Sequence, residues 1–302
     1  MSLARMTIST PPDFSFWKTV NSHGWCSLPP FSIDREQQLL RIPCSLSGGS
    51  YAACTISQSD SKLHVRIGSR RQLSRRQREA VRGQLLQCLR LDEDLSEFHA
   101  EARKYRHYRW IPRLRVGRLL RAPTVFEDVV KMICTTNCSW ALTEAMVGNL
   151  TNKLGTPVDS SGNAFPSPET IANVNESYLR REIRAGYRSP YLLELARRVA
   201  GGDLPLETWR TSTLPTEDLY EQVLAVKGLG PYAAGNILRL LGRYDYLALD
   251  SWVRKRFSEL HRNGRKASDA VIEKHYGPFG KWKGLFFWLE MTEYWYKQEF
   301  PF

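Results

Sequence analysis

The alternation of apolar and polar residues changes character along the chain. In the first part, the segments LLRIPCSL, SYAACTISQ and KLHVRIGS have the composition of β-strands, and Ser59-Asp60-Ser61 supplies a turn between the last two. The next segment, SRRQREAVRGQLLQCLRL, places apolar residues at helical spacing: Val81, Leu85, Leu86 and Leu89. Residues 1–98 are therefore predicted to form a small antiparallel sheet covered by one amphipathic helix.

From Leu95 onward the apolar spacing indicates helices joined by short connections. The predicted helices span roughly 95–104, 124–136, 139–154, 168–184 in pieces, 189–200, 216–226, 232–242, 251–260, 267–276 and 281–297. The predicted fold class is thus α+β, with an antiparallel sheet plus helix domain over residues 1–98 and an all-α domain over residues 99–302.

Charge and cysteine content narrow the possible partners. Lys and Arg number 43 against 31 Asp and Glu, a net charge of +12, which favours a polyanionic partner such as nucleic acid. The sequence has no apolar run of about eighteen residues and no apolar core of a secretory signal, so we expect an intracellular protein of the cytoplasm, nucleoid or nucleus. The six cysteines include no C-x-x-C pair, so no zinc or iron–sulfur site built on cysteine is expected.

The segment VKGLGPYAAGNILRLLG, which begins at Val226, holds two glycines between two apolar helical stretches. Glycine at 228 and 230 permits positive φ and close approach of the backbone, and the helix that follows points its N-terminal dipole at the same place. Such a turn can bind phosphate without reading sequence. A glycine cap between two packed helices explains the same residues equally well.

A lone acid follows at Asp250, between YLAL and SWVRKRF, where it is predicted to cap the next helix. Most acids in such positions do no chemistry. The functional alternative is a carboxylate that the positive helix end keeps ionised beside a cationic transition state.

Together, hairpin, alanine-rich helix and acid resemble the signature of the HhH-GPD superfamily of DNA glycosylases. The segments LRLDEDLSEFH and TVFEDVVKMICTTNCSW are similar to the 3-methyladenine and 8-oxoguanine branches, which also possess an N-terminal sheet domain. The resemblance implies that Asp250 takes part in cleavage of the N-glycosidic bond. It also implies that the hairpin 227–232 binds DNA phosphate, through Lys227, Gly228, Leu229, Gly230 and Tyr232.

Further residues match positions that, in the 8-oxoguanine branch, contact the DNA where the target base has been moved out of the duplex. Asn137 matches an asparagine that fills the vacated space, and Tyr187 and Arg188 match a wedge and its neighbour facing the orphaned base. Such enzymes act on double-stranded DNA containing a damaged base. We expect a monomer that requires no cofactor and no catalytic metal.

The sequence departs from strand-cleaving relatives at Tyr232, which stands where they carry a lysine that forms a Schiff base. A phenol cannot form an imine, so we expect a monofunctional glycosylase without AP lyase activity.

The substrate prediction rests on aromatic residues. Trp25, Trp282 and Phe286 are candidates for a pocket that stacks a cationic alkylated purine, although each of them can equally be a core residue. Leu142 stands where the 8-oxoguanine branch has an arginine, which favours alkylpurine removal. The alternatives are an 8-oxoguanine or mismatch-thymine glycosylase and a noncatalytic DNA-binding protein.

Overall fold

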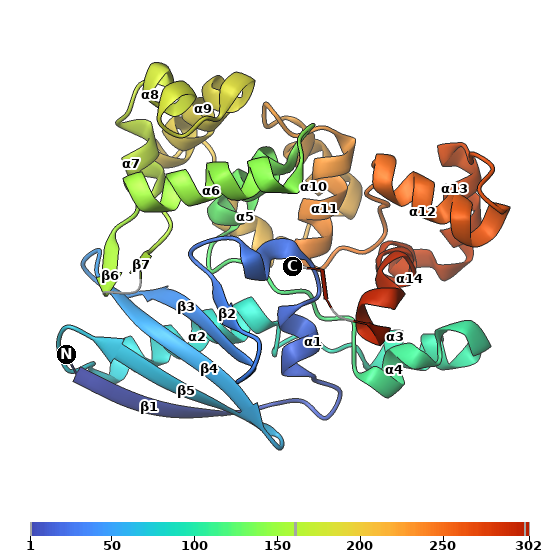
Figure 1. The fold of residues 1–302 in the computed structure, drawn as a ribbon, viewed down its shortest axis with the longest axis horizontal. Helices are drawn as coiled ribbons and strands as arrows, with labels where there is room; N and C mark the ends of the chain where they lie inside the picture. Colours follow the sequence, from blue (N-terminus) through green and yellow to red (C-terminus); the bar gives the residue numbers. More distant parts are fainter. Residues whose placement is uncertain (1, 160–161, 299, 302) are drawn as a thin grey trace.

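The computed structural model describes residues 2–159, 162–298 and 300–301. Its N-terminal part is a five-stranded antiparallel sheet in the order β1-β5-β4-β3-β2 (Figure 1). The strands are β1 (Ser2–Ser9), β2 (Ser32–Asp34), β3 (Leu39–Ser45), β4 (Tyr51–Ser59) and β5 (Lys62–Ser69). The antiparallel sheet is confirmed, and it gains two edge strands that the apolar pattern did not indicate.

The sheet is buried by helix α2 (Arg75–Leu89) and by the rest of the core. The helix begins at Ser74, whose side chain forms a capping box with Gln77, and it buries Val81, Leu85, Cys88 and Leu89. Alternate residues of β4 and β5 are buried in the same core. The cysteines are free thiols, and all except Cys138 are buried.

Beyond the sheet the chain is almost entirely helical, which agrees with the expected α+β class. The helices are α3 (Ser96–Lys104), α4 (Trp110–Leu114), α5 (Val125–Thr135), α6 (Trp140–Leu154), α7 (Pro168–Ala172), α8 (Glu176–Arg181), α9 (Ser189–Ala200), α10 (Thr216–Leu224), α11 (Pro231–Leu241), α12 (Ser251–Arg262), α13 (Asp269–Tyr276) and α14 (Lys283–Lys297). A short hairpin, β6 (Pro157–Asp159) and β7 (Gly162–Asn163), interrupts the part expected to be all-α.

One hydrophobic core joins the sheet to helices as far along the chain as α11, since it extends from Ile8 to Leu240 across the expected boundary at residue 98. A second core lies among α3, α4, α12, α13 and α14, which sit together at the right of Figure 1. Helices α10 and α11 lie between this group and α6–α9 in Figure 1. The segment after β1, with α1 (Phe16–Val20), packs its aromatic side chains into the first core.

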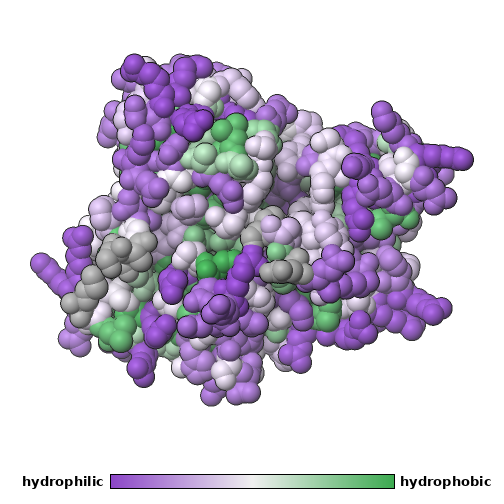
Figure 2. Space-filling model, in the orientation of Figure 1, coloured by the Kyte–Doolittle hydropathy of each residue, from purple (hydrophilic) through white to green (hydrophobic). Residues whose placement is uncertain are grey.

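The exposed face in Figure 2 is mostly hydrophilic, with small apolar patches between the elements. Among the described residues, no helix combines the length and apolar character needed to cross a membrane.

Candidate active site

The two glycines of the hairpin between α10 and α11 have different backbone conformations. Gly228 has a φ of 92°, and a Cβ there would lie 3.0 Å from Cδ2 of Tyr191. Gly230 has a φ of −93° and is the N-cap residue of α11. The expected positive φ is therefore found at Gly228 and not at Gly230, because the chain is already extended where it enters the helix.

The N-terminus of α11 is open to an external group. No side chain caps this helix, and Pro231 lies in its first turn. A Cβ on Gly230 would meet no protein atom within 4 Å. The first N–H groups of a helix have no partner inside the helix, so this terminus offers donors and a positive dipole to an anion.

A groove of about 400 Å³ runs along the hairpin. Its lining includes Thr136, Asn137, Tyr187, Tyr191 and residues 228–233. Asn137 has a φ of 46°, a conformation that asparagine tolerates, and its Nδ2 lies 3.4 Å from the Tyr187 hydroxyl. Tyr187 is 46% exposed. The structure thus brings the expected wedge residues Asn137 and Tyr187 to the same groove as the hairpin.

Arg188 does not face this groove. It is only 3% exposed, and its guanidinium donates to the backbone oxygen and to Oγ1 of Thr136 while stacking 4.4 Å from the centre of the Tyr187 ring. The expectation that Arg188 meets an orphaned base is therefore corrected. Its contacts hold the Thr136 and Tyr187 segments together.

Lys227 lies on the surface beside the hairpin, where its Nζ is 2.8 Å from Glu194 Oε2. Its side chain is 65% exposed, and exposed pairs of this kind contribute at most about 1 kcal/mol. The lysine can therefore exchange this partner for another anion at small cost.

A deeper cavity of about 470 Å³ adjoins the groove, since Tyr232 lines both. Asp250 lies in its wall together with five tryptophans: Trp25, Trp140, Trp252, Trp288 and Trp295. Polar groups in the wall come from His23, Asn236 and Arg239. The cavity is thus an aromatic chamber with one carboxylate and one guanidinium.

Asp250 is the N-cap residue of α12, as the sequence predicted. Its Oδ1 accepts a hydrogen bond of 2.8 Å from the backbone N–H of Val253. The cap fixes the position of the carboxylate at the start of the helix. Because the same side chain lines the cavity, capping and a chemical role are compatible.

Burial controls the ionisation of the groups around Asp250. It raises the pKa of the Tyr232 phenol to about 12, with the negative charge of Asp250 contributing in the same direction. Burial lowers the pKa of Arg239 to about 10, so its guanidinium stays charged at neutral pH, and it stacks 4.4 Å from the ring centre of Trp288. Burial also lowers the pKa of His23 to about 3, so the imidazole is neutral.

Trp25 reaches the cavity from the segment that follows α1. Its Nε1 donates a 2.7 Å hydrogen bond to Asp128 Oδ1, and the backbone N–H of Ala122 donates to the same oxygen at 2.9 Å. His23 packs edge-on at 5.0 Å between ring centres. These contacts hold the indole in one orientation in the wall.

The two other expected pocket residues, Trp282 and Phe286, lie in the second core instead. Phe286 packs against Phe98 and Phe279, with ring centres 4.9 and 4.3 Å apart, and Trp282 packs against Phe98 at 5.3 Å. A helix turns about 100° per residue, so Phe286 lies about 200° around α14 from Trp288. The helix therefore presents Trp288 and Trp295 to the cavity and Phe286 to the core.

Sequence reasoning missed four cavity tryptophans: Trp140, Trp252, Trp288 and Trp295. One signal was present, because Trp288 and Trp295 are seven residues apart and thus share a helix face. Trp252 follows Asp250 by two residues and stacks on Trp295 at 5.9 Å.

The sequence is similar to one protein family and to individual DNA glycosylases. The HhH-GPD superfamily base excision DNA repair protein family matches residues 130–279. The chain is similar to the "Putative DNA-3-methyladenine glycosylase YfjP" of Bacillus subtilis, with 26% identity over 133 residues that make up 41% of this chain and 44% of that protein. It is also similar to the N-glycosylase/DNA lyase of Saccharomyces cerevisiae, with 23% identity over 175 residues, 52% of this chain and 45% of that protein. The matches span less than half the length of these two relatives.

The fold is similar to that of solved structures over nearly its whole length. For the 3-methyladenine DNA-glycosylase from Archaeoglobus fulgidus the TM-score is 0.76 at 22% identity, covering 96% of this chain and 99% of that one. For the apo form of the 8-oxoguanine glycosylase/lyase of Clostridium acetobutylicum it is 0.73 at 18% identity, covering 95% of each. At such identities the likeness shows the fold and does not identify the substrate.

Proposed function

Since the chain belongs, through residues 130–279, to the HhH-GPD superfamily of base excision DNA repair proteins, we propose that it is a monofunctional DNA glycosylase. It hydrolyses the bond between a damaged base and its deoxyribose in double-stranded DNA. The observation that carries the proposal is the position of Asp250 in the wall of an aromatic cavity that adjoins the hairpin groove at Tyr232.

The hairpin binds a phosphate of the DNA strand. Gly230 leaves the uncapped N-terminus of α11 open to close approach, which suits an anion held by backbone N–H groups. Lys227 supplies positive charge at the same turn, and the net charge of +12 favours a polyanion as a whole.

Asn137 and Tyr187 occupy the space that the extruded nucleotide leaves. They line the same groove as the hairpin. The exposed Tyr187 ring offers a flat surface for stacking, and the Asn137 amide can donate to exposed base edges. Unstacking a base costs a few kcal/mol, and these contacts offset part of it.

Asp250 stabilises the positive charge that develops on the sugar as the base departs. A carboxylate already fixed in position does this with little reorganisation of solvent, and the same group can orient and deprotonate the attacking water. No metal or organic cofactor takes part in this scheme.

The nucleophile is water, because Tyr232 occupies the position of the imine-forming lysine. Its phenol has a pKa of about 12 through burial and the nearby Asp250, so it remains protonated at neutral pH. The product is therefore an abasic site in an intact strand.

The proposed substrate is an alkylated purine. The cavity wall holds Trp25, Trp140, Trp252, Trp288 and Trp295. Electron-rich indole faces attract the delocalised positive charge of an alkylated base, and Asp250 adds a negative charge to the same chamber.

One observation favours a second candidate, a neutral oxidised purine such as 8-oxoguanine. Arg239 is a buried guanidinium in the same wall, which repels a cationic base and can donate hydrogen bonds to a purine carbonyl. Leu142 counts against this candidate, because it stands where the 8-oxoguanine branch has the arginine that contacts the base opposite the lesion.

The test is a panel of duplexes that each carry one defined lesion, including an alkylated purine, 8-oxoguanine and a thymine mismatch. Alkali treatment converts each abasic site into a strand break, so breaks that require alkali indicate base release without lyase activity. We expect alkali-dependent breaks with the alkylated purine. Strand breaks without alkali would overturn the monofunctional assignment. If no duplex in the panel is cut even after alkali, the assignment as a glycosylase is overturned.

A further inference from the structure

The second core contains a buried carboxylate that is surrounded by histidines. Glu290, on α14, is 3% exposed. His107 Nε2 lies 2.9 Å from its Oε1, and His261 Nε2 lies 3.4 Å from the same oxygen. The aromatic cavity uses neither histidine.

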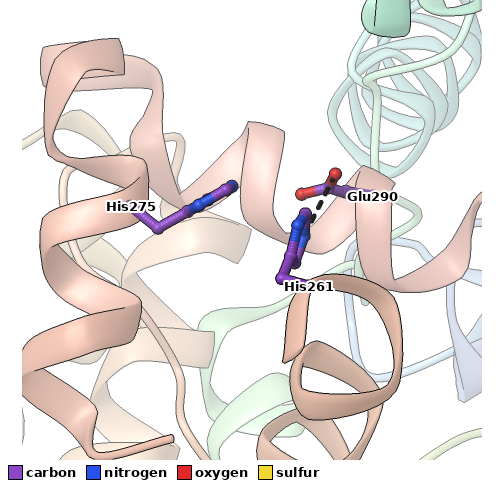
Figure 3. Close-up of side chains that lie close together, drawn as sticks. All are labelled: His261, His275 and Glu290. Carbon is purple, nitrogen blue, oxygen red and sulfur yellow. Dashed lines mark ion pairs between the residues drawn. The ribbon is translucent and has the colours of Figure 1, made fainter. Parts of the chain in front are cut away.

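A third histidine completes the group. His275, on α13, packs against His261 with ring centres 4.3 Å apart. The ligand atoms of His261, His275 and Glu290 all lie within 4.8 Å of one another, and among the described residues they form the one cluster of three or more potential ligands. Figure 3 shows the two imidazoles converging on the carboxylate from α12 and α13.

The other carboxylate oxygen is already held by the protein. Oε2 of Glu290 accepts hydrogen bonds from the hydroxyl of Tyr108, at 3.0 Å, and from the hydroxyl of Tyr276. Such outer partners orient a metal-ligating carboxylate. They leave Oε1 as the atom that faces the histidines.

The distances suit a tetrahedral ion. With bonds of about 2.0–2.1 Å to nitrogen and oxygen, two ligand atoms of a tetrahedral zinc site lie about 3.3 Å apart. The Oε1 distances of 2.9 and 3.4 Å to His107 and His261 bracket that value. The ligand atoms of His261, His275 and Glu290 lie within 4.8 Å of one another, so the His275 ring has to rotate toward the other two when an ion binds.

We propose that His261, His275 and Glu290 bind one zinc-like divalent ion, with His107 close by on the same carboxylate oxygen. Imidazole and carboxylate groups are ligands that zinc accepts, and imidazoles disfavour the hard ions magnesium and calcium. The ion links helices α12, α13 and α14.

The role of this site is structural. Glu290 lies about 200° around α14 from Trp288 at 100° per residue, so the ion sits behind the cavity wall. Helix α12 carries Asp250 at one end and His261 in its last turn. Metal binding therefore fixes the two helices that hold the carboxylate and three of the cavity tryptophans, without contact with the base. The proposal does not depend on the proposed glycosylase activity.

The experiment uses the full chain, stripped with a chelator and then titrated with Zn²⁺. We expect one zinc per chain after removal of excess metal, and a melting temperature that rises with zinc concentration and is unchanged by Mg²⁺. The exposed His275 is the site to alter, because His275→Ala removes a ligand at small cost to the core. Its zinc affinity should fall at least tenfold.

His64→Ala is the matched control, because this exposed histidine on β5 lies in the sheet, far along the chain from the cluster. It should bind zinc like the unaltered protein. Equal zinc affinity in the His275→Ala variant, or no retained zinc in the unaltered chain, would overturn the proposal. Either result would leave the glycosylase assignment untouched, since that is tested by base release.

Discussion

Replacing Gly230 by alanine separates a role in the fold from a role in DNA binding. The backbone at this position has a φ of −93°, which alanine adopts freely. The added Cβ would meet no protein atom within 4 Å. If Gly230→Ala greatly weakens DNA binding, the cause is therefore a clash between the new methyl group and the DNA, and not a change within the protein.

Gly230→Ala should have a small effect on stability and a larger effect on DNA affinity. Alanine is a poorer N-cap residue than glycine, so the free energy of unfolding should fall by no more than about 1 kcal/mol. On DNA, the methyl group occupies the approach of the phosphate. Losing one hydrogen bond to a charged oxygen costs about 1.5–3 kcal/mol, which is roughly a 10- to 150-fold loss of affinity.

The assay is fluorescence anisotropy with a duplex that carries a stable abasic-site analogue, at several salt concentrations, together with urea unfolding. Gly228→Ala is the matched variant, because it needs a φ of 92° and brings its Cβ to 3.0 Å from Tyr191. That variant should lose stability, by about 1–2 kcal/mol or more. If Gly230→Ala binds DNA as tightly as the unaltered protein and with the same salt slope, the phosphate role of the hairpin is refuted.

Three further predictions concern buried groups. Lys131 lies 2.7 Å from Glu127 and both are buried, so Lys131→Met should destabilise the fold by about 3–5 kcal/mol in urea unfolding, and the double variant with Glu127→Leu should regain most of it. His23 has a pKa of about 3 in the folded protein, whereas the same side chain in the unfolded chain takes up a proton below about pH 6.5. The free energy of unfolding should therefore fall by about 2 kcal/mol from pH 7 to pH 5, and the fall should be smaller in His23→Gln. Tyr232→Phe should keep base release without strand cleavage between about pH 6 and 9, since the phenol stays protonated; a rate that collapses in single-turnover assays would show that the hydroxyl takes part.

Local patterns were sufficient for the fold class and for the parts of the site that are continuous in sequence. The alternation in β3, β4 and β5 predicted the sheet, and the turn residues and apolar faces predicted the helices around the hairpin. The cap position of Asp250 followed from the apolar residues on both sides of it. Each of these features depends on neighbours within a few residues.

The cavity could not be predicted in the same way, because its wall is assembled from distant segments. Trp25, Trp140, Tyr232 and Trp288 meet only in the folded chain. Helix α14 is rich in aromatic residues on several faces, so its sequence does not say which ring faces the cavity and which faces the core.

Arg188 shows a second limit of sequence reasoning. Its position beside Tyr187 suggested contact with DNA, yet its guanidinium is buried against Thr136. Loop conformations depend on tertiary contacts that composition does not reveal. The histidines around Glu290 were missed for a similar reason, since three helices and one turn bring them together.

The most direct test of the central claim is single-turnover base release by Asp250→Asn from a duplex carrying an alkylated purine, measured beside its DNA affinity. Asparagine caps helices as well as aspartate and can still accept from Val253 N–H, so the fold and the cavity should persist. We expect DNA binding to be retained and the rate of base release to fall by about a hundredfold or more. Base release at the unaltered rate would contradict the assignment of Asp250 as the group that stabilises the departing sugar.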